Sequence, residues 1–209
     1  RSFELALRWQ TPGVKVNPVR GIQRPKIANA RDRFLSSAEA ARLLKAADAS
    51  LNPQLGNIVR LLLLTGARKR ELLDARWEDV DIERRAWFIP TAKTGSRYVP
   101  LSQAALDVIE KLPRFKNCPW LLPNPETRRP YTDIKHPWET AREAAGLDGL
   151  HIHDLRHSAA SFMINAGIDL FAVGKVLGHA DHQSTMRYAH LANDTLLAAV
   201  EAGAAKMHL

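Results

Sequence analysis

Residues 53–74 read PQLGNIVRLLLLTGARKRELLD, and this stretch predicts a buried helix that ends in a basic turn. Pro53 is a typical first residue of a helix. The apolar side chains after it recur at spacings of three and four, which indicates a helix with a buried face. Thr65-Gly66 ends this helix, and a short helix from Lys69 to Asp74 follows. Arg68 therefore lies at the junction of two helices. The apolar positions are Leu55, Ile58, Val59, Leu62 and Leu63.

The helical pattern recurs along the chain, and β-like sequence is confined to one short region. Residues 86–90 and 97–101 flank Lys93-Thr94-Gly95-Ser96, which is typical of a hairpin tip. Ser36 with Glu39 forms a capping box before a helix. These patterns predict a mainly α-helical domain with a small antiparallel β-sheet, of the α+β class. The helices are expected at residues 2–9, 36–49, 102–112, 133–145, 153–166, 170–177 and 184–188, with a last one from Asn193 or Asp194 to 206.

Composition restricts the class of protein. The 209 residues are 45% hydrophobic and 25% charged, as in ordinary globular proteins. The longest apolar run, residues 58–64, is interrupted by Arg60 and is too short to span a bilayer, and no signal peptide is expected. Cys118 is the only cysteine, which excludes an intramolecular disulfide and a cysteine-built metal site. We therefore expect no membrane partner and a location in the reducing cytoplasm.

Positive charge is concentrated at the start of the chain. The formal net charge is +8, and residues 1–33 hold eight basic residues against Glu4 and Asp32. A basic, proline-punctuated arm before a nearly neutral body favours a polyanionic partner, with nucleic acid first. The alternative is a solvated linker that happens to be positive. The candidate DNA-binding residues in this arm are Arg20, Arg24, Lys26, Arg31 and Arg33.

Separate segments carry residues that suit phosphoryl chemistry. The Arg68 guanidinium could donate two hydrogen bonds to one phosphate, although a surface arginine is the alternative for this segment alone. Lys93, at the hairpin tip, suits a proton donor or a phosphate clamp. His179 follows a Val-Leu-Gly turn, and Tyr188 comes nine residues later. A tyrosine hydroxyl is a weak nucleophile unless a base and anion-stabilising groups meet it in space.

The segment His151-Ile152-His153-Asp154-Leu155-Arg156-His157 allows two interpretations. On a helix that begins here, His153 and Arg156 are three residues apart and share a face. An imidazole can move a proton while the guanidinium offsets developing charge. His153 and His157 are also four residues apart, as in a metal site, but zinc needs a third ligand and Arg156 would repel a cation. We therefore expect no metal here.

Taken in order, these residues resemble the tyrosine recombinase (phage integrase) family, whose pattern is Arg, Lys on a β-hairpin, His-x-x-Arg, His or Trp, then Tyr. The surrounding motifs match as well: Thr-Gly-x-Arg-x-x-Glu-Leu, His-Asp-Leu-Arg-His, Leu-Gly-His and Tyr-x-His. The resemblance covers residues 31–191 and implies the catalytic-domain fold of that family. The catalytic residues that it implies are Arg68, Lys93, His153, Arg156, His179 and Tyr188.

The resemblance implies a site-specific recombinase that needs neither a metal nor ATP, and no cofactor. Tyr188 would attack a scissile DNA phosphate and form a 3′-phosphotyrosine, leaving a free 5′-hydroxyl. Arg68 and Arg156 would bind the non-bridging oxygens and offset the charge that grows in the transition state. The covalent intermediate keeps the energy of the phosphodiester, so that the 5′-hydroxyl of a partner strand can rejoin it.

The remaining residues have supporting roles in this scheme. Lys93 would protonate the departing 5′ oxygen, His153 would take the tyrosine proton, and His179 would donate a hydrogen bond to the phosphate. Glu71, one turn from Arg68, either orients the site or forms an ordinary ion pair within its helix.

The resemblance also implies the domain organisation and the partners. Residues 1–33 would be a remnant of a core-binding domain with a basic linker, residues 34–192 the catalytic domain, and residues 193–209 a tail helix exchanged between protomers. The expected partners are double-stranded DNA attachment sites, further copies of the chain in a tetramer on DNA, and a DNA-bending accessory protein. The expected location is the cytoplasm of a bacterium, with the nucleoid.

Two other functions use the same residues or the same fold. A type IB topoisomerase relaxes supercoils with nearly the same residues, but the Leu-Gly-His segment and the long tail after Tyr188 favour a recombinase. A non-catalytic DNA-binding regulator would need an interrupted set of catalytic residues, and here each position holds a competent residue.

Overall fold

The computed structural model describes residues 2–23, 33–91, 95–179, 181, 183–189, 200–201 and 203–207. The chain forms two compact units, residues 1–32 and residues 33–209. The first contains helix α1 (Ser2–Arg8), which has no buried residue. Its following turn is tied back to the helix, because the Asn17 side-chain amide donates to Glu4 at 2.7 Å.

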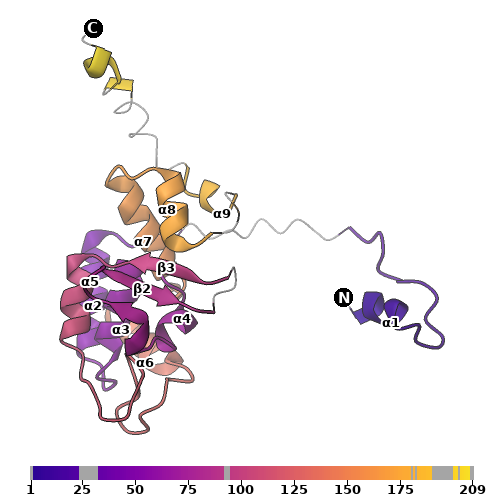
Figure 1. The fold of residues 1–209 in the computed structure, drawn as a ribbon, viewed down its shortest axis with the longest axis horizontal. Coiled ribbons are helices and arrows are strands. Elements are labelled where there is room, and N and C mark those ends of the chain that lie inside the picture. The colour runs from indigo at the N-terminus through magenta and orange to yellow at the C-terminus, as the bar shows by residue number, and fades with distance from the viewer. Residues whose placement is uncertain are drawn as a thin grey trace. The chain divides into compact units, whose positions relative to one another are not determined.

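The second unit is mainly helical, as the sequence predicts, and contains one small sheet (Figure 1). The sheet is antiparallel with strand order β1-β2-β3, and Trp87 pairs with Val80 on one side and Val99 on the other. The elements are α2 (Ser37–Asp48), α3 (Leu55–Thr65), α4 (Lys69–Leu73), the 3-10 helix η1 (Trp77–Asp79), β1 (Val80–Asp81), β2 (Ala86–Ile89), β3 (Arg97–Pro100), α5 (Gln103–Glu110), α6 (Lys135–Ala144), α7 (Asp154–Asn165), α8 (Leu170–Leu177) and α9 (Gln183–Met186).

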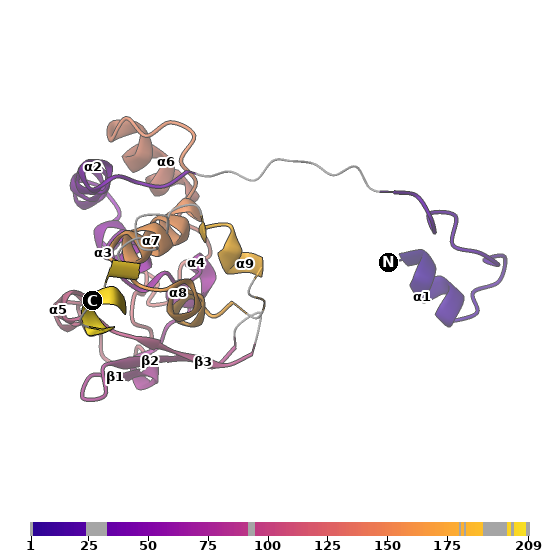
Figure 2. The same ribbon diagram turned by 90° about the horizontal axis from the view of Figure 1, so that it is seen from above.

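Helix α3 lies at the centre of this unit. It packs against α2, α5 and α7, and in Figure 2 the sheet forms one side of the unit while α2 and α6 form the opposite side. Because α3 has contacts on several faces, more of its surface is buried than the single apolar stripe that the sequence predicts. Leu61 is also buried, whereas Leu63, expected in the stripe, is only partly buried.

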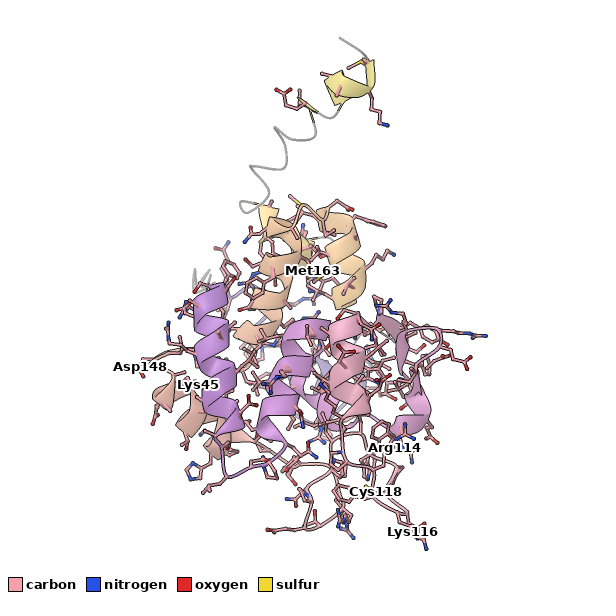
Figure 3. All side chains as sticks on the ribbon, turned by 90° about the vertical axis from the view of Figure 1, so that its left-hand side faces the viewer. Lys45, Arg114, Lys116, Cys118, Asp148 and Met163 are labelled. Carbon is pink, nitrogen blue, oxygen red and sulfur yellow. The ribbon has the colours of Figure 1, made fainter. Side chains whose placement is uncertain are left out.

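The buried residues in the described part of the chain form two clusters. The larger one surrounds α3 and the sheet. The smaller one lies between α7 and α8 and consists of Ala160, Ile164, Val173, Leu177 and Tyr188. Met163, labelled in Figure 3, packs against this smaller cluster. The tyrosine that the sequence singles out is therefore a core residue of the described structure.

The chain after α9 is described only in part. Residues 200–201 and 203–207 are helical, within the helix expected at the end of the chain. Val200 and Met207 on this segment are exposed. The expected cap at Asn193 or Asp194 lies outside the described residues. No helix in the described part of the chain is long and apolar enough to cross a membrane.

Candidate active site

Arg156, in the first turn of α7, is a buried cation held by main-chain oxygens. Its two terminal nitrogens donate to the Gly66 and Leu177 carbonyl oxygens, each at 2.7 Å. These carbonyls lie where α3 and α8 end, and both helices end at a glycine in the left-handed conformation, Gly66 and Gly178. Helix C-termini leave carbonyls without a partner inside the helix. Burial, then the charges of Arg68 and Arg97, lower the pKa of Arg156 to about 10.

Arg68 lies two residues after Gly66 and is the N-cap of α4. Glu71 accepts both the main-chain N–H of Arg68 at 2.9 Å and one guanidinium nitrogen at 2.7 Å. The Arg68 side chain keeps 25% of its surface exposed. Its guanidinium is therefore oriented by the helix that follows it and remains open to a ligand.

Glu71 joins Arg68 to the sheet. It also accepts two hydrogen bonds from Arg97 on β3, at 2.8 and 2.9 Å, and the Arg97 and Glu71 side chains are only 10% and 6% exposed. Burial alone would raise the pKa of Glu71, but the hydrogen bonds from Arg97 and Arg68 lower it to about 2. Glu71 is thus a buried, ionised bridge between two arginines, which is more than an ion pair within its own helix.

Gly178 makes room for this bridge. A Cβ atom at this position would lie 2.4 Å from Cδ and 2.6 Å from Nε of Arg97, and its φ of 67° favours glycine. The Leu-Gly-His segment therefore combines a helix end that binds Arg156 with a close approach to Arg97.

Tyr188 and His157 form a buried pair. Tyr188 is 1% exposed, and its hydroxyl lies 2.5 Å from Nδ1 of His157. Burial raises the pKa of Tyr188, against the effects of Arg187 and Arg156. Burial, then Arg187 and His153, lower the pKa of His157 to about 4. At neutral pH the tyrosine is therefore protonated and the imidazole is uncharged.

The two histidines expected at the site both feel the charge of Arg156. His153, the N-cap of α7, is exposed, and its ring lies edge-on to His157 at 5.0 Å between centroids. Nδ1 of His179 lies 2.8 Å from the Thr185 hydroxyl. Loss of hydration, then the charge of Arg156, lowers the pKa of His153, and the same two causes lower the pKa of His179 to about 4. The surroundings are positive and suit an anion.

The sequence of the second unit matches a known family over most of its length. The model of the phage integrase family matches residues 33–195. The chain belongs to the phage integrase family. This family assignment agrees with the resemblance found in the sequence and with the predicted fold class.

Several relatives in the phage integrase family are similar over most of the chain. A shufflon-specific DNA recombinase of Escherichia coli is 32% identical over 192 residues, which are 90% of this chain and 48% of that protein. The integrase of Haemophilus phage HP1 is 32% identical over 198 residues, 93% of this chain and 53% of the relative. The chain thus spans about half the length of these two relatives.

Solved structures of phage integrases share the fold. The catalytic domain of bacteriophage HP1 integrase is 31% identical with a TM-score of 0.65, covering 80% of this chain and 93% of that domain. A lambda integrase dimer bound to a COC′ core site has a TM-score of 0.69 at 21% identity, covering 90% of this chain and 68% of that one. The second likeness concerns the fold alone.

The structure gathers most of the residues that the phage integrase resemblance implies. Arg156 binds the Gly66 carbonyl after α3, and Arg68 lies two residues further on, close enough to lower the pKa of Arg156. His179 follows α8. The ring of His153 contacts that of His157, which contacts Tyr188. Lys93 lies outside the described residues. Among the described residues, no group of three or more His, Cys, Asp and Glu could hold a metal.

The candidate DNA-binding residues of the arm differ in their surroundings. Arg20 is exposed in the first unit. Arg33 donates to both carboxylate oxygens of Glu39, at 3.2 and 2.6 Å, so DNA would have to compete with this ion pair. Arg24, Lys26 and Arg31 lie outside the described residues.

Two residues that contact this cluster, Arg97 and His157, are absent from the predicted set. Arg97 could have been found from the period of a strand, because it shares a face with Val99, which is fully buried. The sequence places His157 at the end of the His-Asp-Leu-Arg-His motif and, beside His153, in a possible metal pair, but gives it no catalytic role. Its contact with Tyr188 joins positions 31 residues apart, and no local pattern indicates it.

Proposed function

We propose that this chain is the catalytic part of a site-specific DNA recombinase that cleaves and rejoins strands through a 3′-phosphotyrosine. The observation that carries the proposal is the pair of guanidiniums at the end of α3. Arg156 is bound to the Gly66 carbonyl, and Arg68 follows two residues later. A phosphodiester between them would meet two fixed cations from different helices, which is a preorganised site for a transition state that gains negative charge.

The roles of the side chains follow from their positions. Arg68 and Arg156 bind the non-bridging oxygens of the scissile phosphate, and Tyr188 is the nucleophile. His153, which is exposed, and His179 donate hydrogen bonds to the phosphate, since their lowered pKa values keep each ring neutral with one N–H. Lys93 protonates the 5′ oxygen that departs. Guanidiniums and an ammonium supply the charge in this scheme, so it needs no metal ion and no ATP.

Double-stranded DNA attachment sites are the proposed substrate. The support comes from the positive surroundings of the histidines, from the basic arm of residues 1–33, and from the fold shared with an integrase solved on a core site. Arg20, Arg24, Lys26, Arg31 and Arg33 would contact the backbone of DNA next to the cleavage site. A DNA-bending accessory protein and a location with the bacterial nucleoid complete the proposal.

The tail is proposed to join protomers in a tetramer on DNA. Val200 and Met207, on the described part of the last helix, are 69% and 64% exposed. Apolar side chains of this size are suited to contact with a neighbouring protomer. Deletion of residues 195–209 should leave a folded chain that cleaves DNA but exchanges strands poorly. Unfolding of the shortened chain would show that the tail packs on its own domain.

A nicked oligonucleotide tests the function directly. The duplex carries a candidate attachment site from the DNA next to the gene, with a nick just 3′ of the cleavage position. The short fragment with the new 5′-hydroxyl then diffuses away, and the covalent complex accumulates. A protein–DNA adduct that survives denaturation, together with joining of two sites, supports a recombinase. Relaxation of a supercoiled plasmid without joining would instead indicate a topoisomerase, and binding without an adduct would indicate a regulator.

A further inference from the structure

We propose that His157, and not His153, is the catalytic residue that accepts the proton of the Tyr188 hydroxyl during cleavage. The inference rests on the proposed function and gives a role to the last residue of the His-Asp-Leu-Arg-His motif, which the set of six catalytic residues does not include. It starts from the contact that Tyr188 makes: its oxygen lies 2.5 Å from Nδ1 of His157. The acceptor is thus already on the oxygen that would attack phosphorus.

Packing places the two rings of this pair against each other. The Tyr188 ring contacts Phe34 at 6.2 Å and the His157 ring at 5.8 Å between centroids. His157 is 9% exposed and lies in the first half of α7, so its ring can move little. His153 is one turn earlier and exposed, and its ring faces His157 edge-on. The contact of His153 is thus with the imidazole of His157, whereas His157 itself contacts the tyrosine hydroxyl.

The protonation states fit an acceptor. The groups that act on the His157 ring are Asp154 and Arg156 on its own helix, His153, and Arg187 next to Tyr188. Burial and the cations among them keep the imidazole neutral, with a pKa of about 4. Burial keeps the proton on Tyr188. The hydroxyl therefore donates to Nδ1, and the ring proton lies on Nε2.

The step balances without any further reactant. As the Tyr188 oxygen forms its bond to phosphorus, its proton passes to Nδ1 of His157, which becomes an imidazolium. The bond from phosphorus to the 5′ oxygen breaks, and that oxygen leaves with the electron pair and takes a proton from Lys93. The phosphate brings a negative charge into the site. This charge raises the pKa of His157 above its value in the protein without DNA and so favours the imidazolium. Religation runs in reverse, and His157 returns the proton to the tyrosine oxygen.

A first test needs no DNA. Nitrogen-15 NMR of the histidine rings in the whole chain reports which ring nitrogen of His157 carries the proton. We expect an unprotonated, hydrogen-bonded Nδ1 whose resonance shifts in Tyr188→Phe and stays in Tyr98→Phe, because Tyr98 is 68% exposed and its ring contacts Phe88 in the sheet. A proton on Nδ1 in the unmodified chain would overturn the inference, since His157 would then be a donor to Tyr188.

A second test separates acceptance of the proton from the hydrogen bond. Asparagine can place an oxygen near the position of Nδ1 and accept the hydrogen bond, but it cannot take the proton. His157→Asn should therefore form the adduct about 100-fold more slowly or worse, with unchanged affinity for DNA. His157→Phe, which fills a similar space, should slow adduct formation at least as much. Agreement of the two variants would show that the slower rate does not come from asparagine itself.

The substrate can be altered to show which proton transfer is lost. With sulfur in place of the 5′ bridging oxygen, the leaving group needs no proton, so Lys93→Ala should recover most of its rate. His157→Asn should not recover. The matched variant His153→Asn should weaken phosphate binding, and excess protein should restore its rate.

Two results would overturn the inference. One is that His157→Asn cleaves as fast as the unmodified chain. The other is that His153→Asn slows adduct formation and neither the substrate with 5′ bridging sulfur nor excess protein restores its rate. Absence of any adduct from the unmodified chain would count against the proposed function itself.

Discussion

The guanidinium of Arg156 joins the ends of two helices, because it donates to the Gly66 carbonyl that follows α3 and to the Leu177 carbonyl at the end of α8, at 2.7 Å each. Its position is thus set by backbone atoms on both sides. The planar group spans two acceptors that a point charge cannot span. This one side chain thus links α7, which carries His157, to the ends of α3 and α8. Arg68 follows the first of these ends at the start of α4, and His179 follows the second.

Replacement of Arg156 by lysine should therefore be severe although the charge is kept. We expect formation of the covalent adduct to fall by about 100-fold or more, as measured on the nicked oligonucleotide. Arg42→Lys is the control, because Arg42 also donates to a main-chain oxygen, that of Ala145, but from α2. Cleavage by Arg156→Lys at the rate of this control would show that the paired hydrogen bonds of the Arg156 guanidinium have no role in cleavage.

Replacement of Tyr188 by phenylalanine should abolish the covalent adduct and leave DNA affinity nearly unchanged, since a single oxygen is lost. The free energy of unfolding should fall by about 1 kcal/mol, because His157 loses its partner. Gel analysis under denaturing conditions and urea unfolding measure the two effects. Tyr98→Phe, in the exposed position on β3, should change neither. An adduct with the Tyr188 variant would mean that another residue is the nucleophile.

Glu71→Gln should make the protein less stable at pH 7 and less sensitive to acid. The pKa of Glu71 is about 2 in the folded state and about 4.3 in an unfolded chain. Because the pKa of Glu71 is lower in the folded state, its ionisation stabilises the native state at pH values above the pKa of the unfolded chain. This contribution to the free energy of unfolding is lost as the pH falls from about 4 to about 2. At pH 7 the variant should lose about 3 kcal/mol, because Arg97 stays buried with a weaker partner.

Urea unfolding at several pH values checks this prediction. The control is Glu139→Gln, whose exposed pair with Lys135 at 3.9 Å should contribute at most about 0.5 kcal/mol. Equal losses in the two variants, or an unchanged acid transition in Glu71→Gln, would contradict the assignment of a buried ionised bridge.

Gly178→Ala should be costlier than the same change at another left-handed glycine. Gly167 has a φ of 86° and nothing within 4 Å of a Cβ, whereas Gly178 has a φ of 67° and faces Arg97. Both substitutions carry backbone strain of about 1 kcal/mol. Only Gly178→Ala should displace Arg97, and so it alone should slow cleavage as well as lower stability. Equal activity of the two variants would show that the close approach is without consequence.

Removal of residues 1–32 should reduce the salt dependence of DNA binding. This segment carries seven basic and two acidic residues, while the Arg33–Glu39 pair at the start of α2 is kept. Each phosphate contact that is lost should flatten the slope of log K against log salt by about 0.9. Fluorescence anisotropy at several salt concentrations measures the slope. An unchanged slope would mean that the arm does not touch the phosphates.

Local signals account for most of the predicted fold. The capping box of Ser36 and Glu39 begins α2, and Gly66 ends α3, as the sequence predicts. Both features depend on residues within one helical turn, so the sequence contains them in full. Strand β1 escaped prediction because its two residues exist as a strand only through pairing of Val80 with Trp87. A two-residue run has no period to detect.

The residues of the candidate site also fall into those that local sequence indicates and those that only tertiary contacts reveal. Arg68 and Arg156 could be proposed from motifs, because their residue types are unusual at helix starts and suit a phosphate. The roles of Arg97 and His157 depend on partners 26 and 31 residues away. Such pairs form only when β3 meets α4, or when the segment after α9 folds against α7. Sequence patterns cover single elements, whereas these contacts are properties of the folded unit.

The main-chain cradle of Arg156 changes which kinds of mutation the site tolerates. A carbonyl oxygen is present whatever side chain its residue bears, so substitutions at Leu177 leave the acceptor in place. Insertions and deletions are different, because one extra residue in the eight-residue helix α8 turns its end by about 100°. The Leu177 carbonyl would then point away from the guanidinium. The position of the Leu177 carbonyl therefore depends on the number of residues in α8 and not on the side chain at Leu177.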